Sequence, residues 1–378
     1  MTQTLSTSQN KSESTWQNQA WLASAQWDSL FILAPAFITS ALVICFRPFF
    51  ENSSNLPLWA WVVLVMMVDV AHVYATLFRT YLDKEALKKN KSLLIAIPLA
   101  CWAVGALLYS MSKGGDGNLF WRTLAYLAVF HFIRQQYGFM ALYSRKDSDT
   151  ARKFKYLDGA CLYLATIYPI LYWHTHLPRN FNWFVAGDFA TTLPEIASHA
   201  GLCIYLVVAA GYIVKEIWLY AKLKIFNIPR NLLITGTALS WWVGIVSMNS
   251  DMAFTLTNVV SHGIPYMALV WLYHSSKSSH NVNALNLKPS LVGQIFLSYV
   301  PAFVMFLVLL AFLEEGLWDG FIWREHLAFF GPFGALPAIN DPAILSILIP
   351  FLALPQSVHY VLDGFIWRVK ERDNVWSA

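Results

Sequence analysis

Long apolar runs separated by short polar segments form the pattern of this chain. Ten runs approach or exceed the about 20 residues that an α-helix needs to cross a bilayer. They cover about residues 29–50, 57–79, 93–112, 118–144, 155–174, 194–221, 230–248, 252–274, 290–313 and 343–368. Runs of this length do not fit the short alternating strands of a membrane barrel. The pattern predicts an all-α, polytopic transmembrane helical bundle with about ten spans.

The basic residues of the connecting segments predict how the spans are oriented. They gather after every second run and after the tenth: Lys84, Lys88, Lys89, Lys91, Arg145, Lys146, Arg152, Lys153, Lys155, Lys222, Lys224, Arg230, Lys277, Lys288, Lys370 and Arg372. The alternate segments are poor in them, with Lys113 after the third run and Arg179 after the fifth. Because cytoplasmic loops are the basic ones, we expect both termini in the cytoplasm, which agrees with an even number of spans. A multi-pass protein of a bacterial inner membrane would have this pattern.

Composition supports a protein whose main partner is the lipid bilayer. Hydrophobic residues make up 57% of the 378 residues and charged residues 13%, against about 25% charged in a soluble domain. The net charge of +4 comes from basic residues in short loops and not from a stripe beside an aromatic platform, so nucleic-acid binding is not expected. The pattern does not indicate an oligomeric state.

Polarity divides the chain into three parts. Residues 1–27 are rich in Ser, Thr, Gln and Asn, lack the features of a cleaved signal peptide, and are predicted to form an N-terminal tail or interfacial segment. Residues 28–369 form the predicted transmembrane helical domain, and 370–378 a C-terminal tail. The longest connection, about 314–342, is predicted to form a re-entrant or interfacial cap.

Four even-numbered spans each contain one histidine that a span does not ordinarily have: His72, His131, His262 and His359. These spans run in the same direction, so the number of residues to the cytoplasmic end measures depth. That number ranges from seven, between His72 and Arg79, to fourteen, between His131 and Arg145. At 1.5 Å per residue the depths agree within about 10 Å. We therefore predict four imidazoles at one level.

Polar neighbours lie on the same helix faces as these histidines. Asp69 is three residues from His72, and Asp363 is four from His359, so each carboxylate can accept the second ring N–H of a metal-bound histidine or help fix the orientation of a nearby ligand. Asn258 and Gln135, each four residues from a site histidine, are the other predicted supporting groups. Two further residues are candidate catalytic groups: Tyr266 and Arg134. An unpaired buried arginine is costly, so Arg134 is predicted to pair with Asp69 or Asp363.

A metal or redox site is the interpretation that these residues favour. One buried histidine usually makes an interhelical hydrogen bond, but four at one depth, two of them beside carboxylates, exceed that need. Nitrogen and oxygen ligands without thiolate suit non-haem iron, copper or zinc. Two alternatives stay open: a b-type haem electron-transfer protein with axial histidines, and a proton-coupled transporter with an Asp/His/Arg relay.

At these residues the sequence resembles the Brp/Blh type of membrane β-carotene 15,15′-dioxygenase. The similarity covers four short stretches only: Ala71-His72-Val73, His131-Phe132, Ser261-His262-Gly263, and His359 with Asp363 and Arg368. The chain departs from the family at Tyr266, where the family has a second histidine ligand. The resemblance implies dioxygen and non-haem Fe²⁺ held by His72, His131 and His262, with His359 or Tyr266 completing the shell. It implies an iron oxygenase acting on an apolar lipid or isoprenoid, carotenoid-like substrate.

Overall fold

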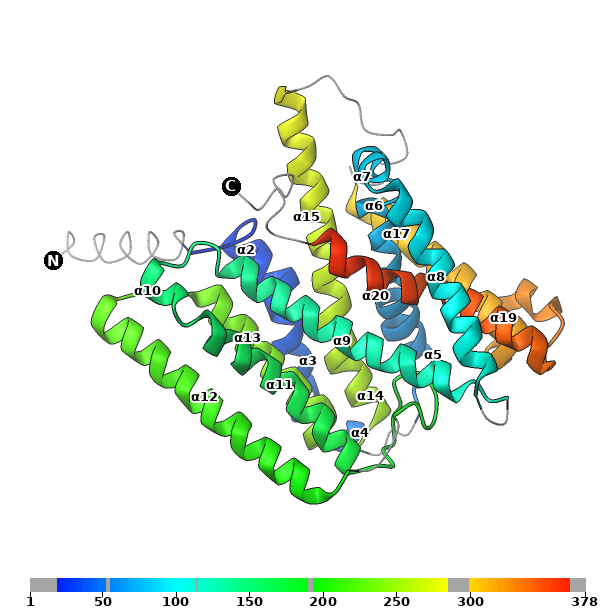
Figure 1. Ribbon diagram of the computed structural model, residues 1–378, viewed down its shortest axis with the longest axis horizontal. Coiled ribbons are helices and arrows are strands. Elements are labelled where there is room, and N and C mark those ends of the chain that lie inside the picture. The colour runs from blue at the N-terminus through cyan, green and yellow to red at the C-terminus, as the bar shows by residue number, and fades with distance from the viewer. Residues whose placement is uncertain (1–18, 52–54, 113–114, 190–192, 285–298, 368–378) are drawn as a thin grey trace.

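The computed structural model describes residues 19–51, 55–112, 115–189, 193–284 and 299–367, with only the backbone for 275–284. These residues form helices and connecting turns, which confirms the all-α class for the described part of the chain (Figure 1). The first half contains α2 (Ala25–Asp28), η1 (Ser29–Leu33), α3 (Ala34–Cys45), α4 (Arg47–Phe50), α5 (Leu58–Ala60), η2 (Trp61–Val70), α6 (Ala71–Arg79), α7 (Lys84–Lys89), α8 (Lys91–Ser110), α9 (Asn118–Tyr143), α10 (Asp149–Arg152) and α11 (Lys155–Thr175). The second half contains α12 (Glu195–Leu223), α13 (Ile228–Trp241), η3 (Trp242–Ser247), α14 (Asp251–Phe254), η4 (Thr255–Val259), α15 (Val260–Ala284), α17 (Val300–Trp318), η5 (Asp319–Trp323), α18 (Leu327–Phe330), η6 (Gly331–Ala335), α19 (Pro342–Leu352) and α20 (Leu354–Ile366).

Several of these helices are long and apolar enough to cross a membrane. Within the described residues there are five such helices: Ala25–Cys45, Leu58–Arg79, Lys91–Ser110, Glu195–Leu223 and Val300–Trp323. A sixth results if α19 and α20, which are bent by 45° at their junction, form one broken span. The other predicted spans are also helical, but α9, α11, α13 and α15 carry more polar side chains. The count of about ten spans and the cytoplasmic location of both termini therefore stay predictions.

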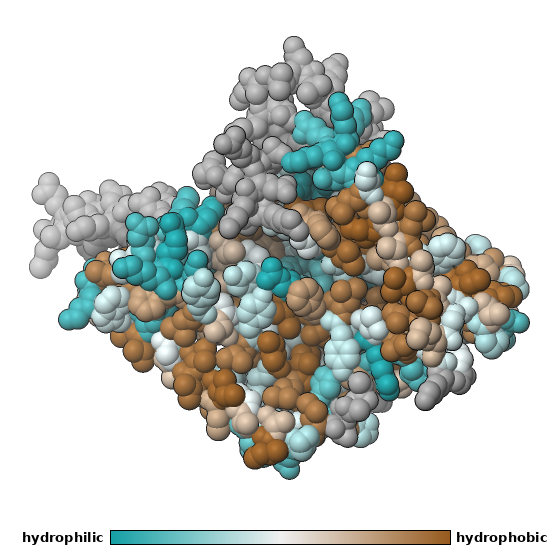
Figure 2. Space-filling model, in the orientation of Figure 1, coloured by the Kyte–Doolittle hydropathy of each residue, from teal (hydrophilic) through white to brown (hydrophobic). Residues whose placement is uncertain are grey.

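The outer surface of the helices suits contact with lipid. On α12, Ile204, Val207, Val214 and Ile217 are each more than half exposed. Figure 2 shows brown, hydrophobic residues over α8 and α12, whereas teal residues gather at α7 and α10. Large exposed apolar areas are uncommon on soluble proteins and mark membrane or protein contacts. This surface is compatible with a membrane protein.

The described end of the predicted N-terminal tail packs against the helical domain. Trp21 and Leu22 are buried in a cluster with residues of α9, α11 and α13. Asp28 accepts a hydrogen bond of 2.6 Å from the Leu22 amide, and Arg145 donates to the Trp21 carbonyl. Residues 1–18 and the predicted tail 370–378 lie outside the described residues.

Four helices meet at the centre of the molecule, and each contains one of the predicted histidines. α6 packs against both α15 and α20, and α20 also packs against α9. α20 is short because the chain bends before it, with Ala353 outside the helical pattern and Pro355 in its first turn. Proline has no N–H to donate and is favoured at this position. The bend directs α20 into the centre of the bundle, as the red helix in Figure 1 shows.

Candidate metal centre

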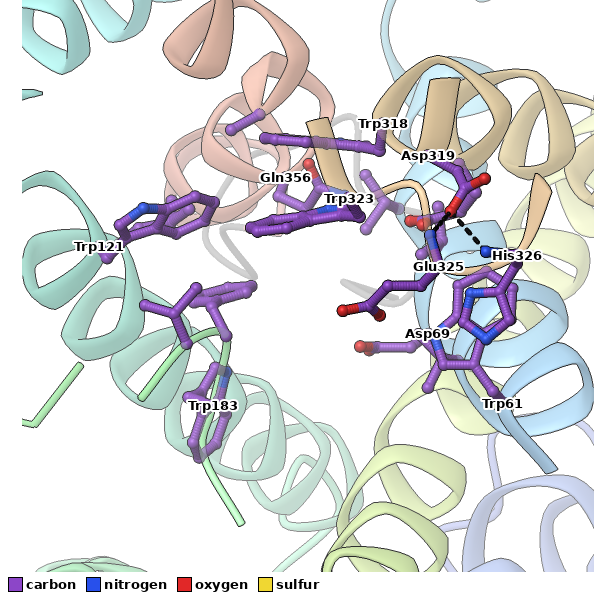
Figure 3. Close-up of a pocket in the computed structure, with 18 of the residues that line it drawn as sticks. Trp61, Asp69, Trp121, Trp183, Trp318, Asp319, Trp323, Glu325, His326 and Gln356 are labelled. Carbon is purple, nitrogen blue, oxygen red and sulfur yellow. Dashed lines mark hydrogen bonds between the residues drawn. The ribbon is translucent and has the colours of Figure 1, made fainter. Parts of the chain in front are cut away.

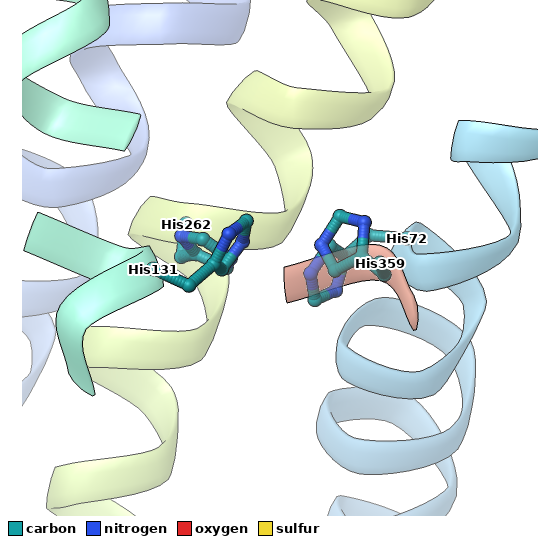
Figure 4. Close-up of side chains that lie close together, drawn as sticks. All are labelled: His72, His131, His262 and His359. Atoms are coloured by element: carbon teal, nitrogen blue, oxygen red, sulfur yellow. The ribbon is translucent and has the colours of Figure 1, made fainter. Parts of the chain in front are cut away.

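The structure brings the four predicted histidines together in one buried cluster. His72 lies on α6, His131 on α9, His262 on α15 and His359 on α20, and each is at most 3% exposed. One ring nitrogen or more from each histidine faces the same small space (Figure 4), and the possible ligand atoms lie within 4.8 Å of one another. The prediction of four imidazoles at one level is confirmed. Among the described residues, no other group of histidine, cysteine and acidic side chains converges in this way.

A glycine lets two of the helices approach closely. A Cβ atom on Gly263 would lie 2.9 Å from Val68 Cγ1 and 3.0 Å from the Val68 carbonyl oxygen. Such distances are too short for any side chain larger than that of glycine. The close approach of α15 to the η2–α6 helix brings the rings of His262 and His72 into edge-to-face contact, with centroids 4.8 Å apart.

The hydrogen bond of His72 determines which of its ring nitrogens has a lone pair that can bind a cation. Its Nδ1 lies 3.2 Å from the Val68 carbonyl oxygen. A carbonyl can only accept, so the proton is on Nδ1 and Nε2 carries a free lone pair. This Nε2 is buried and has no hydrogen-bond partner within the described structure. Its lone pair is therefore available to a cation in the cluster.

A chain of three hydrogen bonds fixes the tautomer of His359 in the same way. Tyr266 donates to Asp363 over 2.7 Å. Thr76 lies 2.8 Å from the Tyr266 hydroxyl, and because that proton is already used, Thr76 is the donor. The Thr76 oxygen must then accept from Nδ1 of His359, 2.6 Å away. This leaves the lone pair of His359 on Nε2, which is also buried without a partner.

The other two rings face each other across the cluster. Nε2 of His131 lies 3.2 Å from Nε2 of His262. Two nitrogens that are each about 2.1 Å from one ion lie roughly 3.0 to 3.4 Å apart in octahedral or tetrahedral geometry, so this spacing suits a shared cation. Phe132 stacks on the His262 ring, with centroids 3.5 Å apart and planes 9° from parallel, and thereby holds it in place.

The two aspartates lie beside the rings as their spacing predicts. Asp69 Oδ1 is 3.7 Å from Nδ1 of His72. Asp363 contacts two histidines, with Oδ2 3.7 Å from Nδ1 of His131 and Oδ1 3.8 Å from Nδ1 of His359. These distances are beyond hydrogen-bond range. The Nδ1 atoms of His72 and His359 donate to Val68 and Thr76 instead, and the carboxylates lie beside the rings without bonding them.

Gln135, Asn258 and Tyr266, which were also predicted as site residues, form hydrogen bonds around the cluster or within their own helix. Gln135 donates to the backbone carbonyl of His262 over 2.9 Å, so it supports that histidine through the main chain. Asn258 donates to the Phe254 carbonyl of its own helix over 3.1 Å. The Tyr266 hydroxyl is used by Asp363 and Thr76, and so Tyr266 contributes to the outer layer of the cluster.

Arg134 does not pair with either aspartate, and this prediction is wrong. Its side chain is on the exposed side of α9, where it donates to the Tyr163 hydroxyl over 2.7 Å. The guanidinium also lies 5.0 Å from the centre of the Tyr137 ring. Adjacent positions on a helix differ by about 100°, so a residue three positions after His131 need not reach the same partners. Here the two tyrosines of the α9–α11 contact satisfy the arginine.

Three residues that contact the histidine rings were not predicted from the sequence. Thr76 follows His72 by one helical turn, and Phe132 and Tyr360 are the direct neighbours of His131 and His359. Spacing alone could have indicated Thr76, because residues four apart share a helix face. The stacking of Phe132 on a histidine from another helix has no signal in the sequence.

A cavity of about 330 Å³ adjoins the histidine cluster. Asp69 and Val73, on either side of His72, line it, and so does Tyr360. The Tyr360 ring is 5.0 Å from that of His131. The predicted cap region supplies another wall, through η5 and α18 (Figure 3). The four histidines themselves are not among the lining residues, so the cavity meets the cluster through neighbours such as Tyr360.

Comparison with known proteins gives no assignment for this fold and site. No family model, no curated protein and no solved structure matches the chain.

Proposed function

We propose that the four histidines bind a metal ion and that the protein is a membrane-embedded non-haem iron oxygenase. Its proposed substrates are dioxygen and an apolar, lipid- or isoprenoid-like molecule. The observation that carries the proposal is the direction of the ring nitrogens. Where Nδ1 has an acceptor, Nε2 is free and faces the other histidines. This is the arrangement of metal-bound histidines, whose second nitrogen donates to an outer group.

A purely structural cluster explains these nitrogens less well. In an interhelical hydrogen-bond network each ring nitrogen would have a partner, but Nε2 of His72, Nδ1 of His262 and Nε2 of His359 have none. Each buried polar atom without a partner costs about 1–3 kcal/mol. A cation bound by the nitrogens facing the centre offsets this cost for His72 and His359.

The donor set and the packing favour a single ion. Four nitrogens without thiolate suit iron, copper or zinc, and the resemblance of the histidine motifs to a dioxygenase family selects iron. A b-type haem would separate its two axial imidazoles by a macrocycle. Here the rings touch edge to face, with centroids 4.5 Å apart for His131 and His359 and 5.1 Å for His72 and His359.

The protein's own residues have distinct roles in this proposal. When bound, ferrous iron supplies the binding and activation of dioxygen. His72, His131, His262 and His359 hold the metal. Asp363 accepts from the Tyr266 hydroxyl, and Thr76 and Tyr266 keep the proton of His359 on Nδ1. The adjoining cavity, with its tryptophan side chains, is where the substrate would bind.

The proposed setting is a bacterial inner membrane, crossed about ten times, with both termini in the cytoplasm. The exposed apolar faces of α8 and α12 and the basic segments between alternate runs support this arrangement.

Metal analysis of the protein purified in a mild detergent tests the proposal. We expect about one iron per chain in the wild type and less than a tenth of that after His72→Ala or His359→Ala. His199→Ala is the matched control, because His199 lies on an exposed position of α12. Full iron retention in both site variants, or equal loss in the control, would overturn the proposal.

A further inference from the structure

The cavity beside the histidine cluster has an unusual lining. Five tryptophans line it: Trp61, Trp121, Trp183, Trp318 and Trp323. Four acidic residues line it as well: Asp69, Glu315, Asp319 and Glu325. Lysine and arginine are absent from the described residues that line it. Its volume of about 330 Å³ lies within the range of small-molecule sites, about 300–1,000 Å³.

Four of the tryptophans lie across the cavity from Asp69 and Glu325 (Figure 3), whereas Trp61 lies on the acidic side, stacked on His326 with ring centroids 4.7 Å apart. Figure 3 shows Trp121 and Trp183 on one side, and the carboxylates of Asp69 and Glu325 directed toward them from the other. Trp318 and Trp323 stack, with centroids 5.7 Å apart and planes 17° from parallel. Both also contact Trp121, at 6.0 and 6.1 Å. Trp121, Trp318 and Trp323 therefore form one continuous aromatic wall, called the tryptophan wall below.

The guanidinium of Arg324, which precedes Glu325 in the chain, bonds to backbone carbonyls, and the one imidazole among the lining residues, that of His326, stacks on Trp61. Arg324 donates to the carbonyl oxygens of Gly320, Leu336 and Gly334. The neighbouring Asp319 is 2% exposed, and one of its oxygens accepts from the amides of Glu325 and His326. Its other oxygen, Oδ2, is buried without a hydrogen-bond partner. These bonds hold the turn that carries Glu325, whose carboxylate faces the cavity (Figure 3), and no lysine or arginine among the described lining residues pairs with it.

We propose that this cavity binds an organic cation through an ammonium group held between the tryptophan wall and the carboxylates. Tryptophan faces attract ammonium groups, and this attraction is strongest where water is excluded. A metal ion fits less well, because the carboxylates do not converge: within the described residues, the four histidines are the one group with metal-site spacing. The cation site depends on the cavity alone. Its role as the substrate site, for an apolar molecule with an ammonium group, rests on the proposed function.

Calorimetry on the purified full chain tests the site with two probes of one shape. Choline carries a quaternary ammonium, and 3,3-dimethylbutan-1-ol is its neutral counterpart. The detergent is a maltoside, which has no ammonium group. We expect choline to bind at least about tenfold more tightly than the alcohol, since one strong cation–π contact contributes about a factor of ten. Equal binding of the two probes, or equal displacement of choline by Mg²⁺, would overturn the proposal.

Variants at the rim of the cavity locate the binding. Glu325 is exposed and Trp323 is 42% exposed, so Glu325→Gln and Trp323→Leu change side chains at the rim and remove none from the buried core. Each is expected to weaken choline binding about five- to tenfold, and Glu195→Gln, an exposed acid on α12, not at all. Choline binding unaffected by both rim variants would overturn the site.

Iron content measured on the same samples separates the two proposals. If the protein binds choline but contains no iron, the proposed cation site stands and the proposed oxygenase is refuted. If it contains iron but does not bind choline, the cation site is refuted and the metal site stands. Glu325→Gln is expected to keep its iron, because Glu325 does not contact any of the four histidines.

Discussion

Replacing Thr76 by valine removes one hydroxyl from the histidine cluster and keeps the shape of the side chain. In the wild type this hydroxyl accepts from Nδ1 of His359 at 2.6 Å and donates to Tyr266 at 2.8 Å. Without it, the Nδ1–H tautomer of His359 has no acceptor. The ring then loses the preference that keeps its Nε2 lone pair free for metal.

The expected loss of metal affinity follows from the cost of that orphaned group. A buried donor without a partner costs about 1–3 kcal/mol, which corresponds to roughly 5- to 150-fold in affinity. Outer-layer partners of metal-bound histidines typically change metal affinity by about 10- to 100-fold. We therefore expect Thr76→Val to weaken iron binding by about 10- to 100-fold. Thr76→Ser keeps the hydroxyl and should bind nearly as the wild type does.

Titration with a competing chelator, followed by metal analysis, measures this affinity. Thr39→Val controls for the loss of a buried hydroxyl, because Thr39 bonds a carbonyl of its own helix at 2.8 Å. The reasoning is refuted if Thr76→Val binds iron within twofold of the wild type, or if the serine and valine variants lose affinity equally.

Two further variants, each with a control, test buried contacts, one beside the histidines and one between α12 and α13. Gly263→Ala places a Cβ 2.9 Å from Val68 Cγ1, and we expect a cost of about 1–3 kcal/mol, seen as a lower thermal midpoint together with reduced iron content. Gly138→Ala, which has nothing within 4 Å, should leave both unchanged. Arg230 is 1% exposed and pairs with acidic side chains at 2.6 Å. Replacing it by alanine should lower the free energy of unfolding by about 3–5 kcal/mol. Arg152→Ala, at an exposed ion pair of 3.5 Å, should leave the midpoint nearly unchanged in the same thermal scan.

Much of the helical layout and the histidine cluster follow from local rules. Apolar runs of about 20 residues predict where helices lie, because a backbone in lipid must form its hydrogen bonds within the segment, as a helix does. Asp363 could be placed beside His359 because residues four apart share a helix face. Likewise, equal depth on co-directional helices predicted that His72 and His131 would meet.

What the sequence could not predict depends on contacts between helices. The direction of Arg134 is decided by Tyr163 on α11, and a one-residue shift of helical phase is enough to turn a side chain from the core to the surface. The sequence does not show that Gly263 is needed for close helix packing, because its contact with Val68 exists only in the folded structure. The acidic and tryptophan walls of the cavity come from segments far apart in the chain, so their opposition is a property of the tertiary structure alone.

X-ray absorption at the iron edge of the purified, iron-loaded protein tests the central claim most directly. The four-histidine site predicts a first shell dominated by nitrogen at about 2.1 Å, with the outer-shell scattering of about four imidazole rings, reduced by one ring in His359→Ala. A spectrum with sulfur ligands, a porphyrin signature, or fewer than three imidazoles in the wild type would contradict it.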